Sequence, residues 1–241
     1  MHPSMPMLHY RVDPAIFSAH PGYRLGVVVV DGADNSRSSE PLAPLLRDAE
    51  AAVRNAVTGD VAAHPAIAAW REAYRRFGAR PSEHRSSIEA MVRRVLKPAE
   101  LPAINVLVDI GNIVSLRHRL PAGVHPLVDG THDIALRPAA AGDHFTPADG
   151  GADETPPPGE VVLARGTQVL TRRWTWRQAA GTQTLPQTTR VLFNIDGLPP
   201  VDAATVQAAM DDVAQLVQQH TGGRIVARAV LTVDQPELVL S

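Results

Sequence analysis

The two halves of this 241-residue chain carry different hydrophobic periodicities, and this segregation limits the fold more than any other feature. Apolar residues recur mainly at helical spacing in the first half. Short β-branched runs between turn residues dominate the second. Regular alternation would predict a parallel βαβ sheet, whereas segregated helices and strands predict an α+β fold. No long linker interrupts the pattern, so we expect residues 1–241 to form a single domain.

Caps and breakers set the limits of five predicted helices. One of them begins at Ser86, with Glu89 three residues later in the spacing of a capping box, and it runs to Pro98. The predicted helices cover residues 41–57, 64–77, 86–97, 105–118 and 200–220.

The predicted strands begin with a buried one in YRLGVVVVDGAD, where a β-branched run ends at Asp-Gly. Further strands are predicted at residues 160–166, 168–178, 190–198 and 224–233. Residues 1–7 are expected to form a loose arm. The Gly-, Pro- and Asp-rich residues 138–158 are expected to form one long surface excursion.

Composition excludes several classes of site. The chain has no cysteine, which rules out disulfides, a thiol nucleophile and thiolate metal ligands. The longest apolar run, LGVVVV, is too short to span a bilayer, and the first residues lack the pattern of a signal peptide. We therefore expect a soluble, cytoplasmic protein that does not insert into membranes.

The net charge of −2 hides two segments of opposite charge. Residues 70–119 hold ten basic and five acidic residues, and residues 129–160 hold seven acidic residues and one arginine. In the basic segment, Arg76, Arg80 and Arg85 surround the loop GARPSEHRSS, close to Tyr74 and Phe77. This combination predicts contacts with an RNA backbone, although a solvated helix face with a core aromatic pair would look the same.

The stretch RRWTWRQ concentrates two of the three tryptophans of the chain. Read as a strand, it places Arg172, Trp174, Trp176 and Gln178 on one face. Two interpretations are open. The stretch could belong to a sheet that packs inward and is charged outward, or it could form the wall of a pocket for a flat or anionic ligand.

The helix NVLVDIGNIVSLRH is apolar apart from one stripe. Asn105, Asp109 and Asn112 are spaced i, i+4 and i+7, which puts them on one side of the helix. Such a stripe predicts a connected lining of donors and acceptors for a polar ligand. The structural alternative is a helix cap at Asn105 and an Asp109 carboxylate bonded to nearby backbone.

Common catalytic signatures are missing. The chain has no G-x-S-x-G, no H-E-x-x-H and no P-loop lysine. His118, His125 and His132 recur every seven residues but fall across a helix end and a loop, so we predict no metal site.

Three segments together resemble a known family: YRRFGARPSEHRSSIEAMVRRVL, then LPAINVLVDIGNIVSLRHRLP, then RRWTWRQ followed by TRVLFNIDGL. They resemble the editing module of the phenylalanyl-tRNA synthetase beta chain, the paired B-three/B-four module, and most closely the freestanding proteins built from that module alone. The resemblance covers residues 70–198. Its most specific element is the Asn-x-x-x-Asp-x-x-Asn helix after Leu-Pro.

The resemblance implies a β-sandwich of unusual topology with helices packed around it. It also implies an enzyme that hydrolyses the ester of a wrongly attached amino acid on tRNA, with the aminoacyl end of tRNA as partner and no cofactor. The candidate catalytic residues are Asn105, Asp109, Asn112 and His125; the last stands near a histidine that follows the polar helix in the family. The candidate substrate-binding residues are Arg173, Trp174, Trp176, Arg177 and Gln178.

One departure from the family concerns the amino acid. The synthetase has a glycine-rich run where this chain carries two tryptophans and three arginines. The tyrosine preference of the synthetase therefore does not carry over, and we expect a smaller or more polar pocket. An aminoacyl ester is already activated, so positioned water and a stabilised oxyanion suffice without a protein nucleophile.

Three functions are compatible with these features. The first is a trans-acting aminoacyl-tRNA deacylase, and the second is a tRNA- or RNA-binding module without activity. The third is a hydrolase or sensor for a small amino-acid-like molecule, which the acidic excursion favours because it would repel RNA.

Overall fold

The computed structural model describes residues 8–127 and 133–240, and it contains ten strands and six α-helices in that part of the chain. The strands are β1 (Leu8–Val12), β2 (Arg24–Asp31), β3 (Ala122–Pro126), β4 (Ile134–Pro138), β5 (Val161–Arg165), β6 (Gln168–Arg172), β7 (Arg177–Gln178), β8 (Val191–Gly197), β9 (Arg224–Leu231) and β10 (Glu237–Leu240). The α-helices are α1 (Pro14–Ala19), α2 (Ala43–Ala56), α3 (Pro65–Arg76), α4 (Ser87–Val95), α5 (Val106–His118) and α6 (Ala203–Thr221), with short 3-10 helices at Glu40–Leu42 and Val61–Ala63.

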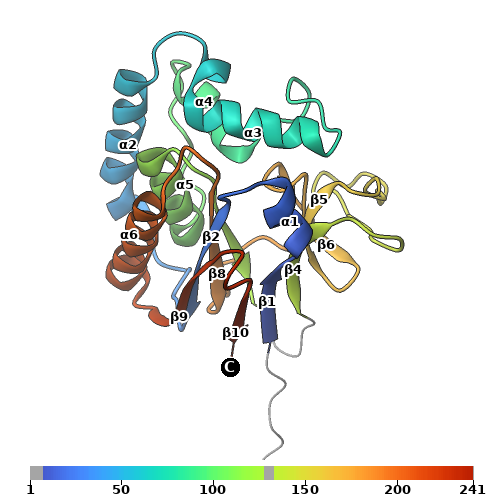
Figure 1. The fold of residues 1–241 in the computed structure, drawn as a ribbon. Helices are drawn as coiled ribbons and strands as arrows, with labels where there is room; N and C mark the ends of the chain where they lie inside the picture. The colour runs from blue at the N-terminus through green and yellow to red at the C-terminus, as the bar shows by residue number, and fades with distance from the viewer. Residues whose placement is uncertain (1–7, 128–132, 241) are drawn as a thin grey trace, which may run out of the picture.

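Two sheets organise the fold. One has six strands in the order β10-β1-β4-β5-β6-β7, and the other has four in the order β3-β8-β2-β9. Every pairing is antiparallel except that of β1 with β4. Helices α2, α5 and α6 lie on one side of the four-stranded sheet and the six-stranded sheet on the other, with α3 and α4 above (Figure 1). The predicted α+β class, two sheets with helices around them, is confirmed.

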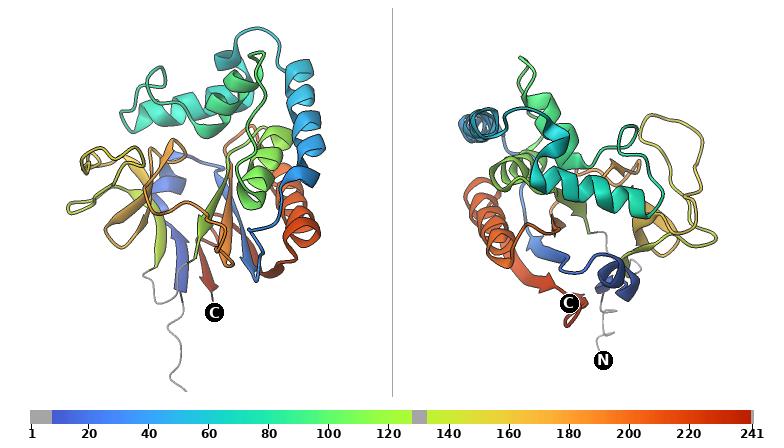
Figure 2. Two further views of the ribbon diagram at one scale, coloured as in Figure 1. Left: turned by 180° about the vertical axis from the view of Figure 1, so that it is seen from behind. Right: turned by 45° about the horizontal axis from the view of Figure 1, so that its top comes forward.

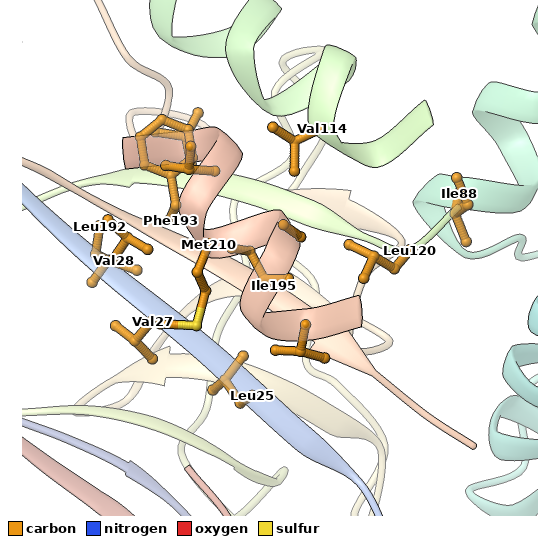
Figure 3. Close-up of a cluster of buried hydrophobic side chains, with 14 of the residues drawn as sticks. Leu25, Val27, Val28, Ile88, Val114, Leu120, Leu192, Phe193, Ile195 and Met210 are labelled. Carbon is orange, nitrogen blue, oxygen red and sulfur yellow. The ribbon is translucent and has the colours of Figure 1, made fainter. Parts of the chain in front are cut away.

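Strand β2 lies at the centre of the main core. Its residues Leu25 to Val30 are buried on both faces, which is why this strand reads as a continuous apolar run rather than an alternating one. Met210 of α6 reaches the strand between Val27 and Leu25 (Figure 3). The same buried core takes in residues of both sheets, from Tyr10 of β1 to Leu240 of β10, and the partly buried Leu8 packs against it.

The five predicted helices are confirmed in position, and two of them have the side-chain caps that the sequence indicated. Ser86 caps α4 by accepting a hydrogen bond from the Glu89 N–H, and Asn105 caps α5 by accepting one from the Val108 N–H. Figure 2 shows from behind how α2, α5 and α6 stack over the sheet. No helix in the described residues has the length and apolar character needed to cross a membrane.

The prediction of one strand over residues 168–178 is wrong. Strand β6 ends at Arg172, four turn residues follow, and β7 begins at Arg177. Arg173 and Trp174 have φ values of 46° and 63°, so the chain reverses there in left-handed conformations that favour glycine. The two tryptophans therefore do not share a pleat face with Arg172 and Gln178.

Ion pairs hold this turn. Arg172 donates two hydrogen bonds to the Glu160 carboxylate, at 2.8 and 2.7 Å, and another to Glu154. Glu160 Oε1 also accepts from the Arg173 N–H at 3.2 Å. All the atoms of the Arg172–Glu160 pair are nearly inaccessible to solvent, and a buried bidentate pair tolerates little displacement. Glu160 thereby holds the left-handed turn at Arg173 and Trp174 in place.

Residues 138–158, expected to form a surface excursion, carry a small core of their own. Phe145 is fully buried and belongs to a cluster with Val162, Val169 and Ala179. Phe145 and Glu154 exchange two backbone hydrogen bonds, at 2.9 and 2.8 Å. At the start of the segment, Arg137 binds Asp143 through two hydrogen bonds. The first residues, 1–7, for which a loose arm was predicted, lie outside the described part of the chain.

The approach of α6 to the four-stranded sheet requires small residues in the strands. A Cβ added to Gly197 would lie 2.6 Å from Val206 Cγ2, far inside the contact distance. We expect Gly197→Ala to lower the free energy of unfolding by about 1–3 kcal/mol, the range for overpacked cores. Urea denaturation measures this loss. In a Val206→Ala background the same substitution should cost clearly less; equal costs in both backgrounds would contradict the proposed clash.

Candidate active site

A pocket of about 190 Å³ lies between the inner faces of the two sheets. The six-stranded sheet contributes Tyr10 and Thr171, and the four-stranded sheet contributes Asn194 and Asp196. Side chains of α4, α5, β3 and the turn after β6 complete the lining. The pocket brings together polar side chains from distant parts of the sequence, whereas two sheets that only pack against each other meet through apolar side chains.

The floor of the pocket is formed by β3 and β8. In their antiparallel register Gly123 lies opposite Asn194, and His125 lies opposite Leu192. Residues opposite each other share a face, as do residues two apart. His125, Asn194 and Asp196 therefore project from the same surface, and Gly123 leaves room between them. A Cβ at Gly123 would lie 3.5 Å from His125 Nε2.

Asp196 lies at one end of the pocket. Its Oδ1 accepts hydrogen bonds from the Tyr23 hydroxyl at 2.5 Å and from the Trp174 indole N–H at 3.0 Å. Burial raises the pKa of this carboxyl to about 6, and the two hydrogen bonds oppose the rise. No residue in the described part of the chain donates to Oδ2, so one carboxylate oxygen is available to a ligand.

Three further polar atoms of the pocket lining lack partners. The Tyr10 hydroxyl, Thr171 Oγ1 and Asn194 Oδ1 are all inaccessible to solvent and are without a hydrogen-bond partner in the part of the chain that the structure describes. Burial raises the pKa of Tyr10, and a polar contact from the Asn194 side chain opposes that rise, so Tyr10 and Asn194 lie side by side on the pocket wall. Buried polar atoms are nearly always satisfied, so an unpartnered group on a cavity wall is typical of a binding site.

His125 lies at the other end, beside Gln178. The Gln178 amide nitrogen is 3.4 Å from His125 Nδ1 and also donates to the Thr182 carbonyl. Burial, with the nearby charge of Arg165, lowers the pKa of His125 to about 4. The imidazole is therefore neutral at pH 7. With Gln178 as the donor to Nδ1, we assign the single proton of the ring to Nε2, which makes Nε2 a hydrogen-bond donor.

The polar stripe of α5 is divided between the pocket and the scaffold. Asn112 lines the pocket, together with Ser115 one turn later. Asn105 caps the helix and donates to the Thr184 carbonyl at 3.2 Å. Asp109 is buried, accepts from the Ile104 N–H at 3.0 Å, and has a raised pKa because of that burial. Among the described residues no hydrogen bond joins the three, so the connected network expected from their spacing is not formed.

The turn after β6 supplies the next wall. Trp174, Trp176, Arg177 and Gln178 all line the pocket. Trp174 points inward, while Arg177 also forms an ion pair with Asp149 of the 138–158 segment at 2.5 Å.

Arg173, predicted to join these residues, lies in a neighbouring hollow instead. That hollow is also lined by Arg80, His84 and Glu160. The Arg173 guanidinium stacks on the Trp176 ring, 4.3 Å from the ring centroid, and Trp176 therefore separates the hollow from the pocket.

The three arginines predicted to contact RNA have different surroundings. Arg76 lies 3.6 Å from Glu72 and donates to the Ala19 carbonyl, and Arg80 pairs with Glu83 at 2.9 Å. Arg85 lines a groove of about 690 Å³ with Arg93, Arg94 and Lys97. We call these four residues the basic groove. Glu89 pairs with Arg93 at 2.9 Å and lies 3.9 Å from Arg85. No acidic side chain in the described residues pairs with Arg94 or Lys97.

Helix α4 connects the basic groove to the pocket. Ser87 and Met91 face the pocket, whereas Ala90, Arg93 and Arg94 face the groove. The helix has nine residues, and an α-helix is only about 10–12 Å wide with its side chains. The charges of Arg94 and Lys97, which no acidic side chain in the described residues pairs with, therefore lie about one helix width from the pocket.

Residues 69–222 match the family model of the B3/4 domain, which is more than half of the chain and includes every element of the pocket except β1. The chain belongs to the B3/4 domain family. A comparison of this B3/4 domain with curated proteins found no match. Among solved structures it is similar to an N-terminal fragment of the phenylalanyl-tRNA synthetase β-subunit from Pyrococcus horikoshii, with 12% sequence identity and a TM-score of 0.48. The similarity covers 92% of this chain and 52% of that one, so the B3/4 domain spans about half of the fragment.

Sequence reasoning missed the polar residues of β8. Asn194 and Asp196 are two apart in the otherwise apolar strand VLFNIDG, a spacing that puts both on one face. The alternation of polar and apolar residues in this strand could have indicated both positions. No local pattern indicates Tyr10 or Thr171, because their position at the cavity depends on the pairing of strands that are distant in the sequence.

The buried carboxyl of Asp196 predicts a specific pH dependence of stability. The pKa of Asp196 is about 6 in the folded protein, compared with 3.8 for an unperturbed aspartate, so ionisation of this carboxyl destabilises the folded state. The loss of stability is absent below pH 3.8 and complete above pH 6. Asp196→Asn lacks the charge but keeps an acceptor for Tyr23 and Trp174. Relative to wild type, we expect its free energy of unfolding to rise by up to about 3 kcal/mol between pH 4 and pH 7. Denaturant unfolding at both pH values measures this; a pH-independent difference would mean that Asp196 is not buried as a charge.

Proposed function

We propose that this B3/4 domain is a trans-acting aminoacyl-tRNA deacylase, which hydrolyses the ester of a wrongly attached amino acid. The observation that carries the proposal is the pocket between the sheets, where a neutral histidine, three amides and a carboxylate with one available oxygen meet unpartnered buried atoms. Membership of the family supports it, because the editing module that the sequence resembles acts on such esters.

The chemistry requires no protein nucleophile. Water adds to the ester carbonyl carbon, the carbonyl oxygen becomes an oxyanion, and the ribose oxygen leaves with a proton that the water gives up. The hydroxyl beside the ester on the ribose can relay that proton. The protein then has to position the ester and donate hydrogen bonds to the oxyanion.

Two of the four predicted catalytic residues are suited to that role. His125 is neutral with a proton on Nε2, and the Asn112 side chain offers an amide N–H. Asn105 and Asp109 support the helix that carries Asn112, through the cap and the bonds to Thr184 and Ile104. Trp176 is partly buried at the edge of the pocket, with Arg173 stacked on its ring, and it is the aromatic residue that we expect the terminal adenosine to contact.

A panel of mischarged tRNAs tests the proposal. We expect ester loss at a rate above the spontaneous one for at least one amino acid. Removal of one oxyanion donor typically lowers the rate by about 100- to 1,000-fold, and we expect His125→Gln and Asn112→Ala each to fall in that range. The matched control is His118→Gln, since His118 pairs with Asp212 away from the pocket.

The same panel distinguishes the other two functions. tRNA binding without ester loss would identify a binding module without activity. Neither binding nor ester loss would leave the hydrolase or sensor of small amino-acid-like molecules.

We place the tRNA backbone on the basic groove, because Arg94 and Lys97 have no acidic partner among the described residues and α4 links the groove to the pocket. Arg94→Ala with Lys97→Ala should weaken tRNA binding. It should also lower the slope of log affinity against log salt by about 0.7–0.9 for each lost phosphate contact. Hydrolysis of a minimal aminoacyl-adenosine should persist. Filter binding over a salt series measures the effect.

Arg75→Ala is the control for these variants, because Arg75 is an exposed arginine of α3 that pairs with Glu72. A triple variant at Arg76, Arg80 and Arg85 tests the arginines predicted from sequence. Equal losses for tRNA and the minimal ester would place these residues in the pocket or in the folding core instead of the docking surface.

A further inference from the structure

We propose that the pocket selects aminoacyl groups whose side chain is small and donates hydrogen bonds, such as a hydroxyl or an amide, and rejects apolar side chains of the same shape. This inference rests on the proposed function and names its substrate class. It is carried by the four polar residues of the inner wall: Tyr10, Thr171, Asn194 and Asp196.

The inner wall is desolvated and incompletely bonded. Tyr10 is 0%, Asn194 and Asp196 are 6%, and Thr171 is 8% exposed. Among residues 8–127 and 133–240, three of these side chains carry an atom without a hydrogen-bond partner, and the fourth, Asp196, accepts hydrogen bonds only at Oδ1. A purely apolar side chain in this space would leave those atoms unpaired and dry, which is the most costly state for a polar group.

The unpaired atoms are mainly acceptors. Asn194 Oδ1 and Asp196 Oδ2 can only accept, whereas the hydroxyls of Tyr10 and Thr171 can accept or donate. A ligand group beside Asn194 Oδ1 and Asp196 Oδ2 must therefore supply hydrogens, as a hydroxyl or amide does. A carboxylate side chain would bring a second negative charge beside Asp196 and should be excluded.

Trp174 keeps the inner end narrow. Its ring contacts Tyr23, Trp70 and His20, with centroid distances of 4.9, 5.1 and 4.9 Å, and its N–H is bound to Asp196. These three ring contacts and the hydrogen bond hold the indole in place, which keeps it from moving aside for a large ligand. The pocket volume of about 190 Å³ also lies below the range of about 300–1,000 Å³ for drug-sized ligands.

The test compares isosteric pairs on the full chain. The probes are 3′-aminoacylamino-3′-deoxyadenosines, which carry an amide in place of the ester, with threonyl, valyl, asparaginyl, leucyl and aspartyl groups. We expect the threonyl and asparaginyl probes to bind at least about 100-fold more tightly than their valyl and leucyl counterparts. A site built to bond a hydroxyl discriminates strongly against its absence. The aspartyl probe should bind more weakly than the asparaginyl one.

Two variants link the preference to the wall. Asn194→Leu keeps the side-chain size and should reduce the threonyl-to-valyl ratio at least tenfold. Asp196→Asn should restore binding of the aspartyl probe. The control is Asp212→Asn, outside the pocket. Circular dichroism checks folding, and if Asn194→Leu does not fold, Asp196→Asn decides alone.

Each result has a defined meaning. Equal affinity within both pairs would overturn the inference. If all probes lose affinity equally in Asp196→Asn, the carboxylate binds the α-amino group, which also overturns it. Hydrolysis of valyl- and threonyl-tRNA at equal rates would refute the selectivity while leaving the deacylase function intact. Absence of hydrolysis for every tRNA would refute the deacylase function, and the binding ratio would still report on the selectivity.

Discussion

The carboxylate of Asp196 joins three parts of the fold that are far apart in the sequence. It belongs to β8 and accepts hydrogen bonds from Tyr23, just before β2, and from Trp174, in the turn after β6. Both donors end on the same oxygen, so the tyrosine, the indole and the strand have fixed relative orientations. Burial raises the pKa of the carboxyl to about 6. A buried carboxylate of this kind lowers the stability of the folded protein at neutral pH. Such a group is typical of a functional site.

A second charged cluster sets the shape of the pocket from outside. Glu160 holds the Arg172 guanidinium and the Arg173 N–H, which fixes the reversal between β6 and β7. The reversal sends Trp174 inward to Asp196 and leaves Trp176 between Arg173 and the pocket. Both interpretations of RRWTWRQ therefore hold in part. Arg172 is a buried ion-pair residue of the scaffold, whereas Trp174 and Trp176 line the cavity.

The sequence predicted the helices well because their signals are local. Ser86 and Asn105 are caps, and the apolar spacing between them and the next breaker defines each helix. Strand β1 was missed because it is short and is stabilised by β10 from the opposite end of the chain. The turn at Arg173 was missed because neither of its left-handed residues is glycine.

The pocket could be predicted only in part, for the same physical reason. Asn112, His125 and Gln178 were candidates from pattern and resemblance, and the structure brings them to one cavity. Asn105 and Asp109 share the helical stripe of Asn112 but point to backbone partners, since the stripe turns away from the cavity at the start of the helix. Asn194 and Asp196 had a detectable alternation. Tyr10 acquires its place only when the two sheets meet.

The most direct test of the account is a crystal structure with 3′-threonylamino-3′-deoxyadenosine. We expect the aminoacyl group between β1 and β8, with its hydroxyl within hydrogen-bonding distance of Asn194 or Asp196 and its carbonyl oxygen beside His125 or Asn112. The adenosine should lie toward Trp176. An analogue bound in the hollow of Arg173 or in the basic groove, with the pocket between the sheets free of it, would contradict the claim that this pocket is the site of ester hydrolysis.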